Sequence, residues 1–294
     1  MVDMSALYNQ LSASTGQLQG AGGASVIGMI SGTAFMGPFS GGAVKAFAVT
    51  NGTLGAQIAS GPTDTHGNFV MQLGSYAGPV MLQISMGAYA DLATGATVSM
   101  YSGDVMTSVI PSITSGATGT GMQITPLTSM AQARAQNMSG GMTGTNATAA
   151  NAAVGNYFDV DNILLTQPMD PSITGSGAAA SQFMRNYGMA IAAISQEAKD
   201  LGMPHSSGMV TAMMMDATDG IMNGMMGGTR ISMNGMGGMG GMMMGDMSTA
   251  AGTSGLAGAM QTFINTPSAN KSGLTLTDMN AIYTKLNGSN GTIQ

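Results

Sequence analysis

The sequence contains no cysteine and no tryptophan, and only 7 Lys and Arg and 13 Asp and Glu occur among its 294 residues. Without cysteine the chain cannot form a disulfide, a thiolate zinc site or an iron–sulfur cluster. The few basic residues form no cluster, so we expect neither nucleic acid nor an anionic membrane surface as a partner. The net charge of −6 comes from 12 Asp and a single Glu.

Groups for catalysis are equally scarce. The chain has two histidines and lacks both a Gly-x-Ser-x-Gly elbow beside a usable histidine and a Gly-Lys-Ser/Thr phosphate loop. We therefore expect no enzyme. No window of about 18 apolar residues predicts a transmembrane helix. The first residues lack the basic and apolar regions of a signal peptide, so the chain is either given in mature form or stays inside the cell.

What the chain does contain is methionine and glycine, at 33 and 46 residues. Fifteen of the methionines lie between positions 203 and 247. Methionine is apolar and flexible, so it fills irregular gaps and adapts to partners. A surface with few charges does little to keep copies of a protein apart. Two interpretations follow: much of the surface is buried in an assembly, or the thioethers bind a soft metal ion.

The N-terminal part has the pattern of short strands. Residues 80–86 alternate between apolar and polar side chains, as a half-buried strand does. Asn51-Gly52 is a dipeptide that closes hairpins. Short strands at regular spacing from Ser25 to about Met100 predict a small antiparallel β-sandwich over residues 24–106. Residues 1–23 precede it as a separate segment and linker.

From about Thr107 the pattern becomes helical, which predicts an α-helical domain over residues 107–294 and hence an α+β fold. Thr125 is expected to cap a helix that has Pro126 in its first turn. The apolar positions from Phe183 to Ala198 form the clearest amphipathic stripe. Further helices are expected at 149–158, 207–215 and 256–264, and after a Thr277 cap. Residues 227–247 hold too much glycine for a helix and predict a Gly/Met-rich loop.

The strand region resembles the carboxypeptidase-regulatory-like domains of bacterial secreted proteins, which are transthyretin-like or Cna-B-like sandwiches. The resemblance rests on Ser40-Gly-Gly-Ala-Val-Lys-Ala-Phe47, Thr63-Asp-Thr-His-Gly-Asn-Phe69, Gly78-Pro-Val-Met-Leu82 and Ala88-Tyr-Ala-Asp-Leu-Ala-Thr-Gly95. The helical part is similar to the region that follows such a domain in some bacterial surface proteins, in the segments 124–128, 150–154, 187–195 and 216–220. The resemblance implies export, an extracellular or cell-surface location and no catalysis.

The methionine-rich stretch includes a candidate copper site. Met233, Met236, Met239 and Met242 follow one another at Met-x-x-Met spacing, and thioether sulfur suits Cu(I). A site of histidine plus methionine would use His205, the histidine nearest to this stretch. The alternative is that these methionines replace leucine as packing residues in a core or a subunit contact.

Candidate subunit contacts lie at two places. Leu7, Tyr8 and Leu11 are apolar side chains in the N-terminal segment, which we interpret as an arm exchanged between subunits. Phe47 and Val49 lie on a strand whose two faces are both apolar, so this strand is expected to contact more than its own core.

The sequence offers two further kinds of candidate site. Asp216, Asp219, Asp159 and Asp161 offer oxygen ligands for Ca²⁺, although turn and cap hydrogen bonds account for them more simply. Asn-x-Ser/Thr acceptors, which could carry glycans in a secreted protein, occur at Asn51, Asn137, Asn146, Asn270, Asn287 and Asn290.

These observations together predict a structural protein. The sequence favours a self-associating subunit, a homopolymer, of an extracellular filament, sheath or surface layer. The alternative is a methionine-rich Cu(I)-binding protein of the cell surface or periplasm.

Overall fold

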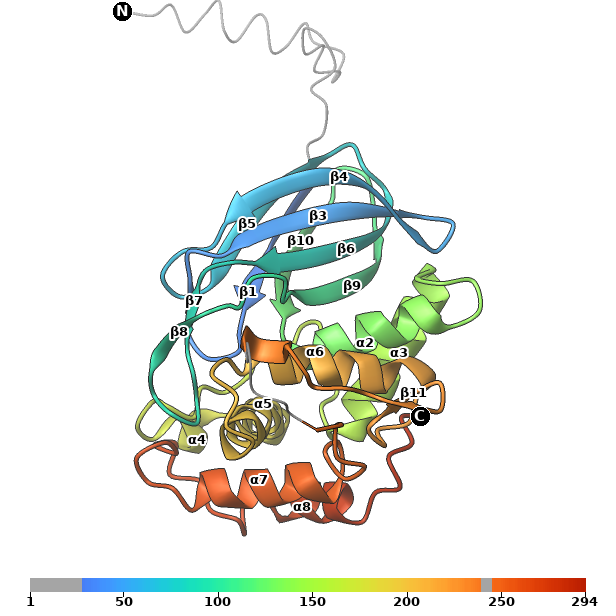
Figure 1. Ribbon diagram of the computed structural model, residues 1–294. Coiled ribbons are helices and arrows are strands. Elements are labelled where there is room, and N and C mark those ends of the chain that lie inside the picture. The colour runs from blue at the N-terminus through green and yellow to red at the C-terminus, as the bar shows by residue number, and fades with distance from the viewer. Residues whose placement is uncertain (1–27, 239–244) are drawn as a thin grey trace, which may run out of the picture.

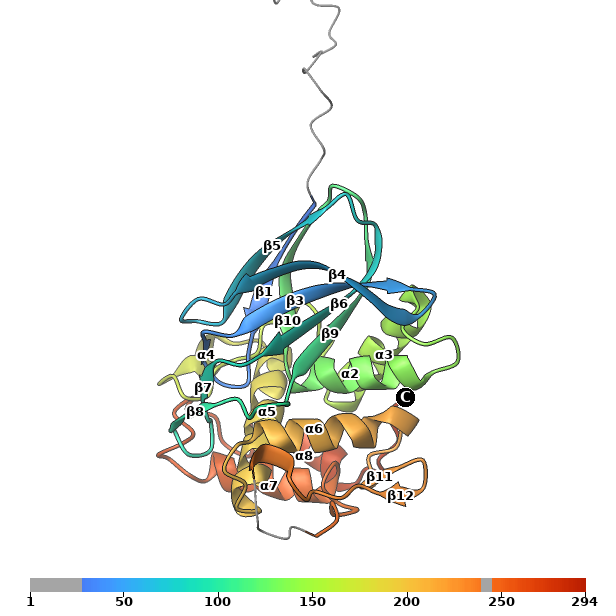
Figure 2. The same ribbon diagram turned by 45° about the horizontal axis from the view of Figure 1, so that its top comes forward.

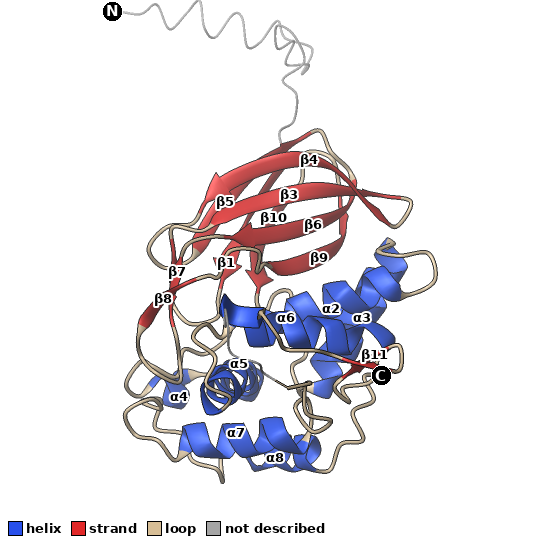
Figure 3. Cartoon of the chain, viewed as in Figure 1, coloured by secondary structure: helices blue, strands red, loops and turns tan. Residues whose placement is uncertain are grey.

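The computed structural model of this protein describes residues 28–238 and 245–294. Strands come first along the chain and most helices follow, so the fold is mixed α+β (Figure 1, Figure 3). The strands β1 to β10 lie between Gly28 and Ile124, and the first described helix begins at Pro126.

A three-stranded sheet has β1 (Gly28–Ala34) at its centre. Strand β5 (Asn68–Gly74) pairs with β1 in the antiparallel direction, whereas β10 (Thr118–Ile124) pairs with it in the parallel direction. The strands within residues 24–106 thus pair in the expected antiparallel way, and the parallel pair comes from β10, which lies beyond the predicted strand region. Between β1 and β10 the chain forms the strands of the other sheets. Strand β10 then pairs with β1 and runs in the same direction.

A four-stranded antiparallel sheet has the order β4-β3-β6-β9. Its strands are β3 (Ala43–Thr50), β4 (Thr53–Pro62), β6 (Gly78–Ser85) and β9 (Met106–Ile113). Asn51 and Gly52 join β3 to β4 with φ angles of 51° and 75°. Positive φ at both central residues is what a tight hairpin turn requires, so the hairpin predicted from this dipeptide is confirmed.

A third, smaller sheet lies beside these two. Its strands are β2 (Phe39–Ser40), β7 (Ala88–Ala90) and β8 (Thr97–Ser99), paired in the order β2-β7-β8. The ring of Tyr89 is fully buried and stacks on that of Phe39, with 6.0 Å between the ring centroids.

The prediction that helices begin near Thr107 is wrong, because β9 and β10 continue the strand region to Ile124. The first five residues of β9 are all buried, since helices cover the face of β9 that does not meet the strand core. A strand that is buried on both faces loses its two-residue alternation, and a short apolar run of this kind cannot be told from a helix by periodicity.

Helix α2 (Pro126–Asn137) begins as predicted. The Thr125 hydroxyl accepts a hydrogen bond from the Thr128 backbone N–H at 3.2 Å, and the Thr128 hydroxyl accepts one from the Thr125 N–H at 2.8 Å. This reciprocal pair satisfies two backbone donors at the helix start. Helix α3 (Gly144–Tyr157) follows, and both helices pack on β9.

The remaining helices lie with α2 and α3 in the half of the molecule away from the large sheets (Figure 2). They are α4 (Ser176–Ala179), α5 (Gln182–Asp200), α6 (Ser207–Asp216), α7 (Ser254–Ile264) and α8 (Asn280–Asn287). The amphipathic stripe predicted a helix at α5, which is confirmed. The expected Thr277 cap is wrong, because α8 is preceded by Met279 and has no side-chain cap.

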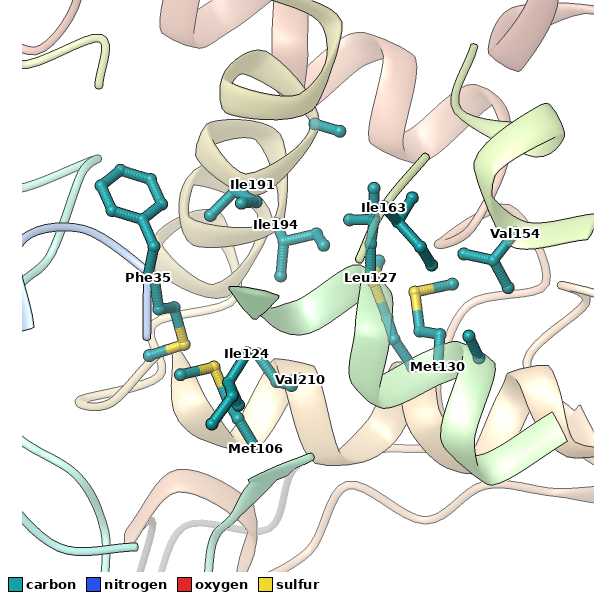
Figure 4. Close-up of a cluster of buried hydrophobic side chains, with 14 of the residues drawn as sticks. Phe35, Met106, Ile124, Leu127, Met130, Val154, Ile163, Ile191, Ile194 and Val210 are labelled. Atoms are coloured by element: carbon teal, nitrogen blue, oxygen red, sulfur yellow. The ribbon is translucent and has the colours of Figure 1, made fainter. Parts of the chain in front are cut away.

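The hydrophobic core is one continuous cluster that contains residues from both the strand and the helical regions. In Figure 4, Met106 and Ile124 from the strands lie beside Ile194 and Val210 from α5 and α6. Methionine contributes much of this core. Within the described ranges, seventeen methionines are buried: Met36, Met71, Met81, Met100, Met106, Met130, Met142, Met169, Met189, Met203, Met209, Met213, Met222, Met233, Met247, Met260 and Met279.

Candidate functional site

The outer face of the three-stranded sheet carries no charged side chain. Met29 and Val70 on this face are 37% and 61% exposed, and Ser31 lies opposite Val70 in the pairing of β1 with β5. The other outward positions of these two strands are Thr33, Asn68 and Gln72. This face borders, at Thr33 and Asn68, a cleft that Ser176 and Ala179 of α4 also line. It is therefore a neutral surface with exposed apolar side chains.

The edge strand β4 adds to this neutral surface. It is ten residues long, its sequence Thr-Leu-Gly-Ala-Gln-Ile-Ala-Ser-Gly-Pro has no charge, and none of its residues is buried. Leu54 is 50% exposed. Natural proteins commonly protect edge strands with lysine, proline or short length, because unpaired backbone N–H and C=O groups can pair with another chain. In β4 the last residue is Pro62, and the strand also lies close to β5 of the other sheet.

The two predicted contact residues on β3 have different environments. Val49 is 5% exposed and belongs to the core, so it offers almost no surface to another copy. Phe47 is partly buried and packs against the core from the outer face of the four-stranded sheet. Leu7, Tyr8 and Leu11 lie outside the described residues, as does the whole segment 1–23.

A polar network joins the strand region to the helices. The Asp91 carboxylate accepts hydrogen bonds from the Ser195 hydroxyl at 2.9 Å and from the Ser206 hydroxyl at 2.7 Å. The Asp104 carboxylate accepts one from the Ser207 hydroxyl at 2.6 Å. Both aspartates are 7% exposed, and a buried carboxylate is tolerated when its lone pairs are satisfied in this way. No sequence pattern predicted these hydrogen bonds, because the partners lie more than a hundred positions apart.

The same cluster does not form a nucleophilic relay. Ser207 donates its hydroxyl proton directly to Asp104, whereas a serine nucleophile would donate it to a histidine. The Nδ1 atom of the neighbouring His205 is buried and has no hydrogen-bond partner among the described residues. His66, the other histidine, lies in an exposed turn next to Thr65. The hydrogen bonds of this cluster join the strand region to α5 and α6.

Two buried carboxyl groups lie near each other where α5 and α6 pack. Burial, and then the charges of Asp200 and Asp216, raise the pKa of Glu197 to about 8. Burial raises the pKa of Asp216 to about 6, although its Oδ1 accepts backbone N–H bonds from Asn223, Gly224 and Met225. Glu197 Oε2 and Asp216 Oδ2 have no hydrogen-bond partner among the described residues. Such groups make stability depend on pH.

The other candidate calcium ligands do not come together. Within the part of the chain that the structure describes, no three His, Asp or Glu side chains are grouped as a metal site would need. Asp219 instead accepts bonds from the backbone of Ile221 and Gly227. These are the turn interactions that the simpler interpretation expected.

The Gly/Met-rich stretch contains short regular pieces. Strands β11 (Met225–Met226) and β12 (Thr229–Arg230) form a hairpin, and η2 (Met236–Gly238) is one 3-10 turn. Met233 is 2% exposed, and Met236 is partly buried against the core. Met239 and Met242 lie outside the described residues.

The candidate glycan acceptors differ in accessibility. The side-chain amide nitrogens of Asn137, Asn146 and Asn270 each donate to a backbone carbonyl oxygen. Asn51, Asn137, Asn287 and Asn290 are exposed, whereas Asn146 and Asn270 are half-buried.

A cleft of about 670 Å³ lies between the end of β1 and the segment around α4. Phe35, Met169 and Met184 contribute apolar walls, and His66 and Asp170 contribute polar groups at its border. Ile173 at this cleft is 57% exposed. The exposed side chains of Leu165 and Phe183, at 51% and 44%, belong to the same stretch of chain.

Comparison with known protein families and with curated proteins shows no match for this sequence. Among solved structures, a 9R-lipoxygenase from Cyanothece PCC8801 shares 14% sequence identity with this chain at a TM-score of 0.22. The match covers 41% of this chain and 20% of the lipoxygenase chain. At that TM-score the likeness carries no argument about fold or activity.

None of the described helices is both long and apolar enough to cross a membrane.

Proposed function

We propose that this protein is a self-associating structural subunit of an extracellular filament, sheath or surface layer, without catalytic activity. The observation that carries the proposal is the charge-free outer face of β1 and β5, which adjoins the uncharged edge strand β4. In this proposal the strands from β1 to β10 form a small β-sandwich of the carboxypeptidase-regulatory-like kind, and its two sheets present the surface.

The energetics favour association of such a surface. Burying apolar area contributes about 25 cal/mol per Å², and a stable contact buries about 800 Å² on each partner. Met29, Val70 and Leu54 supply exposed apolar area, and no charged group on these strands has to be desolvated or left unpaired. The free backbone groups of β4 add hydrogen bonds that are specific for another extended strand.

A filament requires two different surfaces on each subunit, because a contact that uses one surface twice closes into a dimer. The second surface in our proposal is the exposed apolar stretch around α4, which includes Leu165, Ile173 and Phe183. It lies at the opposite end of the molecule from β4 (Figure 1). The sheet surface of one copy would thus contact the α4 side of the next.

The test introduces a lysine on β5 in one variant and on β4 in another. Val70→Lys and Leu54→Lys replace exposed side chains, so the fold should persist while assembly is lost. Ile221→Lys is the matched control, because Ile221 is a comparably exposed apolar residue elsewhere. Light scattering after size exclusion and negative-stain microscopy would be the measurements. A wild-type protein that stays monomeric at high concentration would rule out the proposed function.

A further inference from the structure

The cleft between the end of β1 and the segment around α4 has a row of three polar side chains along one side. Thr33 on the central strand pairs with Asn68 on β5 and with Gln123 on β10, so the three side chains stand side by side across the sheet. All three line the cleft of about 670 Å³. The Thr33 hydroxyl donates to Asn68 Oδ1 at 3.0 Å, which joins two of them.

Gln123 is the member of this row that has an unused acceptor. Its side chain is 3% exposed, and its amide nitrogen donates to the Gly121 carbonyl oxygen at 3.0 Å. Its Oε1 atom is buried and has no hydrogen-bond partner among the described residues. A buried acceptor without a partner is uncommon and lowers stability. A ligand that brings a hydrogen-bond donor to this side of the cleft would remove that penalty.

The rest of the cleft is largely apolar. Phe35, Met169 and Met184 line it, and Ile173 at its border is 57% exposed. Among the described residues that line the cleft, Asp170 is the only Asp, Glu, Lys or Arg. An extended, uncharged peptide matches this lining, because its backbone N–H groups can meet the polar row while its alternate side chains meet the apolar walls. The volume is that of an ordinary ligand pocket, so it would hold a few residues of such a peptide.

The N-terminal segment of this chain has a matching composition. Residues 1–20 contain one charged side chain, that of Asp3. They also contain the apolar Leu7, Tyr8 and Leu11, followed by small and amide-bearing residues. A segment of this kind can enter a neutral cleft without leaving a buried charge unpaired.

The segment is also long enough to reach a cleft on another copy. It joins β1 at Gly28, whereas the cleft lies at the other end of that strand. Residues 12–27, between Leu11 and Gly28, can span at most roughly 60 Å. In the proposed filament the sheet surface of one copy contacts the α4 side of the next. That contact brings the start of β1 in one copy toward the cleft of the next.

We propose that this cleft binds the N-terminal segment of a neighbouring copy. Leu7, Tyr8 and Leu11 would contact the apolar walls, and a backbone N–H of the segment would donate to Gln123 Oε1. The inference rests on the proposed function and adds to it the receiving site on the next subunit. Each copy gives one segment and receives another, so the contact uses two different surfaces and propagates along a filament.

The absence of cysteine allows this contact to be tested with single-cysteine variants. Full-length Asn9→Cys, lengthened by a tag, is mixed with full-length Ala179→Cys and treated with a short bis-maleimide. Ala179 is exposed and lines the cleft, so we expect a cross-linked heterodimer. Thr262→Cys, at an exposed position on α7, is the matched control and should give about a tenth of that yield or less.

Two further measurements identify the segment and the polar row. Excess synthetic peptide with the sequence of residues 1–20 should suppress the heterodimer, whereas a scrambled peptide of the same composition should not. Gln123→Met in the receiving protein should raise the protein concentration for half-maximal cross-linking about tenfold, because the bound segment loses its acceptor. Gln136→Met, at an exposed glutamine on α2, should leave that concentration unchanged. Thermal unfolding of each variant checks that the fold is retained.

Three results would overturn the inference: a yield no higher than that of Thr262→Cys, equal effects of the two peptides, or an unchanged concentration with Gln123→Met. A variant with both Asn9→Cys and Ala179→Cys tests whether the segment occupies the cleft of its own chain. Closed monomers in place of cross-linked pairs would also overturn the inference. If the wild type assembles in light scattering alongside any of these results, the proposed function stands and this contact falls. A wild type that stays monomeric overturns both.

Discussion

Asp91 and Ser206 are joined by a hydrogen bond of 2.7 Å that connects the loop after β7 to the start of α6 across 115 positions of sequence. Ser195 on α5 donates to the same carboxylate oxygen at 2.9 Å. One buried side chain thus holds two helices and a strand region together. We therefore expect its removal to lower the stability of the whole fold.

Replacing Asp91 with alanine should lower the free energy of unfolding by about 2–4 kcal/mol, because two buried hydroxyls would lose a charged acceptor. Asp161→Ala is the control: that side chain is exposed, and surface substitutions of this kind usually change stability by less than about 0.5 kcal/mol. Urea unfolding followed by circular dichroism measures both. Equal stability of the two variants would contradict the bridging role of Asp91.

Stability should fall as the pH rises from about 4.5 to about 8, because of Glu197. Its pKa is raised to about 8 from a model-compound value of 4.5, so the folded protein binds this proton more tightly than the unfolded chain does. The contribution is fully present below the unfolded pKa and is lost as the pH passes the folded pKa. Asp216, with its pKa raised to about 6, acts in the same direction.

The variant Glu197→Gln should weaken this decline, since glutamine stays neutral at every pH. The difference between wild type and variant should grow by at most about 5 kcal/mol across the range, at about 1.36 kcal/mol per unit of pKa. Thermal unfolding at a series of pH values is the measurement. If the pH profiles of the two proteins run parallel, Glu197 is not the titrating group.

Deleting residues 1–20 should give a folded protein that no longer assembles. The described strands begin at Gly28, so the deletion leaves every described strand and helix in the chain. The lost residues include Leu7, Tyr8 and Leu11, which we predict contact another subunit. Circular dichroism and light scattering together test the prediction. Assembly that is unchanged after the deletion would exclude the N-terminal segment as a subunit contact.

Oxidation of methionine should weaken assembly through Met29 before it affects the core. Met29 is exposed on the outer sheet face, whereas Met106 and Met130 are fully buried. A sulfoxide adds a polar group to an apolar contact, and Met29→Gln introduces polarity at the same place. Met226→Gln, at a methionine of similar exposure on β11, should assemble normally. Light scattering distinguishes the two variants, and equal assembly would remove Met29 from the contact.

Local chemistry by itself determined several elements of this protein. Thr125 and Pro126 mark the start of α2 because a hydroxyl acceptor followed by a residue with fixed φ satisfies the needs of a helix terminus. Asn51-Gly52 forms its hairpin turn because both residues tolerate positive φ. The stripe from Phe183 to Ala198 predicts α5, since its period is that of a helix with one buried face.

Only the tertiary structure decided the features that depend on distant partners. Strand β9 looked helical because helices α2 and α3 bury its second face and remove the alternation. Val49, a predicted subunit contact, is instead in the core. The burial of Glu197, and the approach of His205 to the turn after Met236, arise where segments far apart in sequence pack together. Such contacts leave no local pattern, because the physical interaction exists only once the chain has folded.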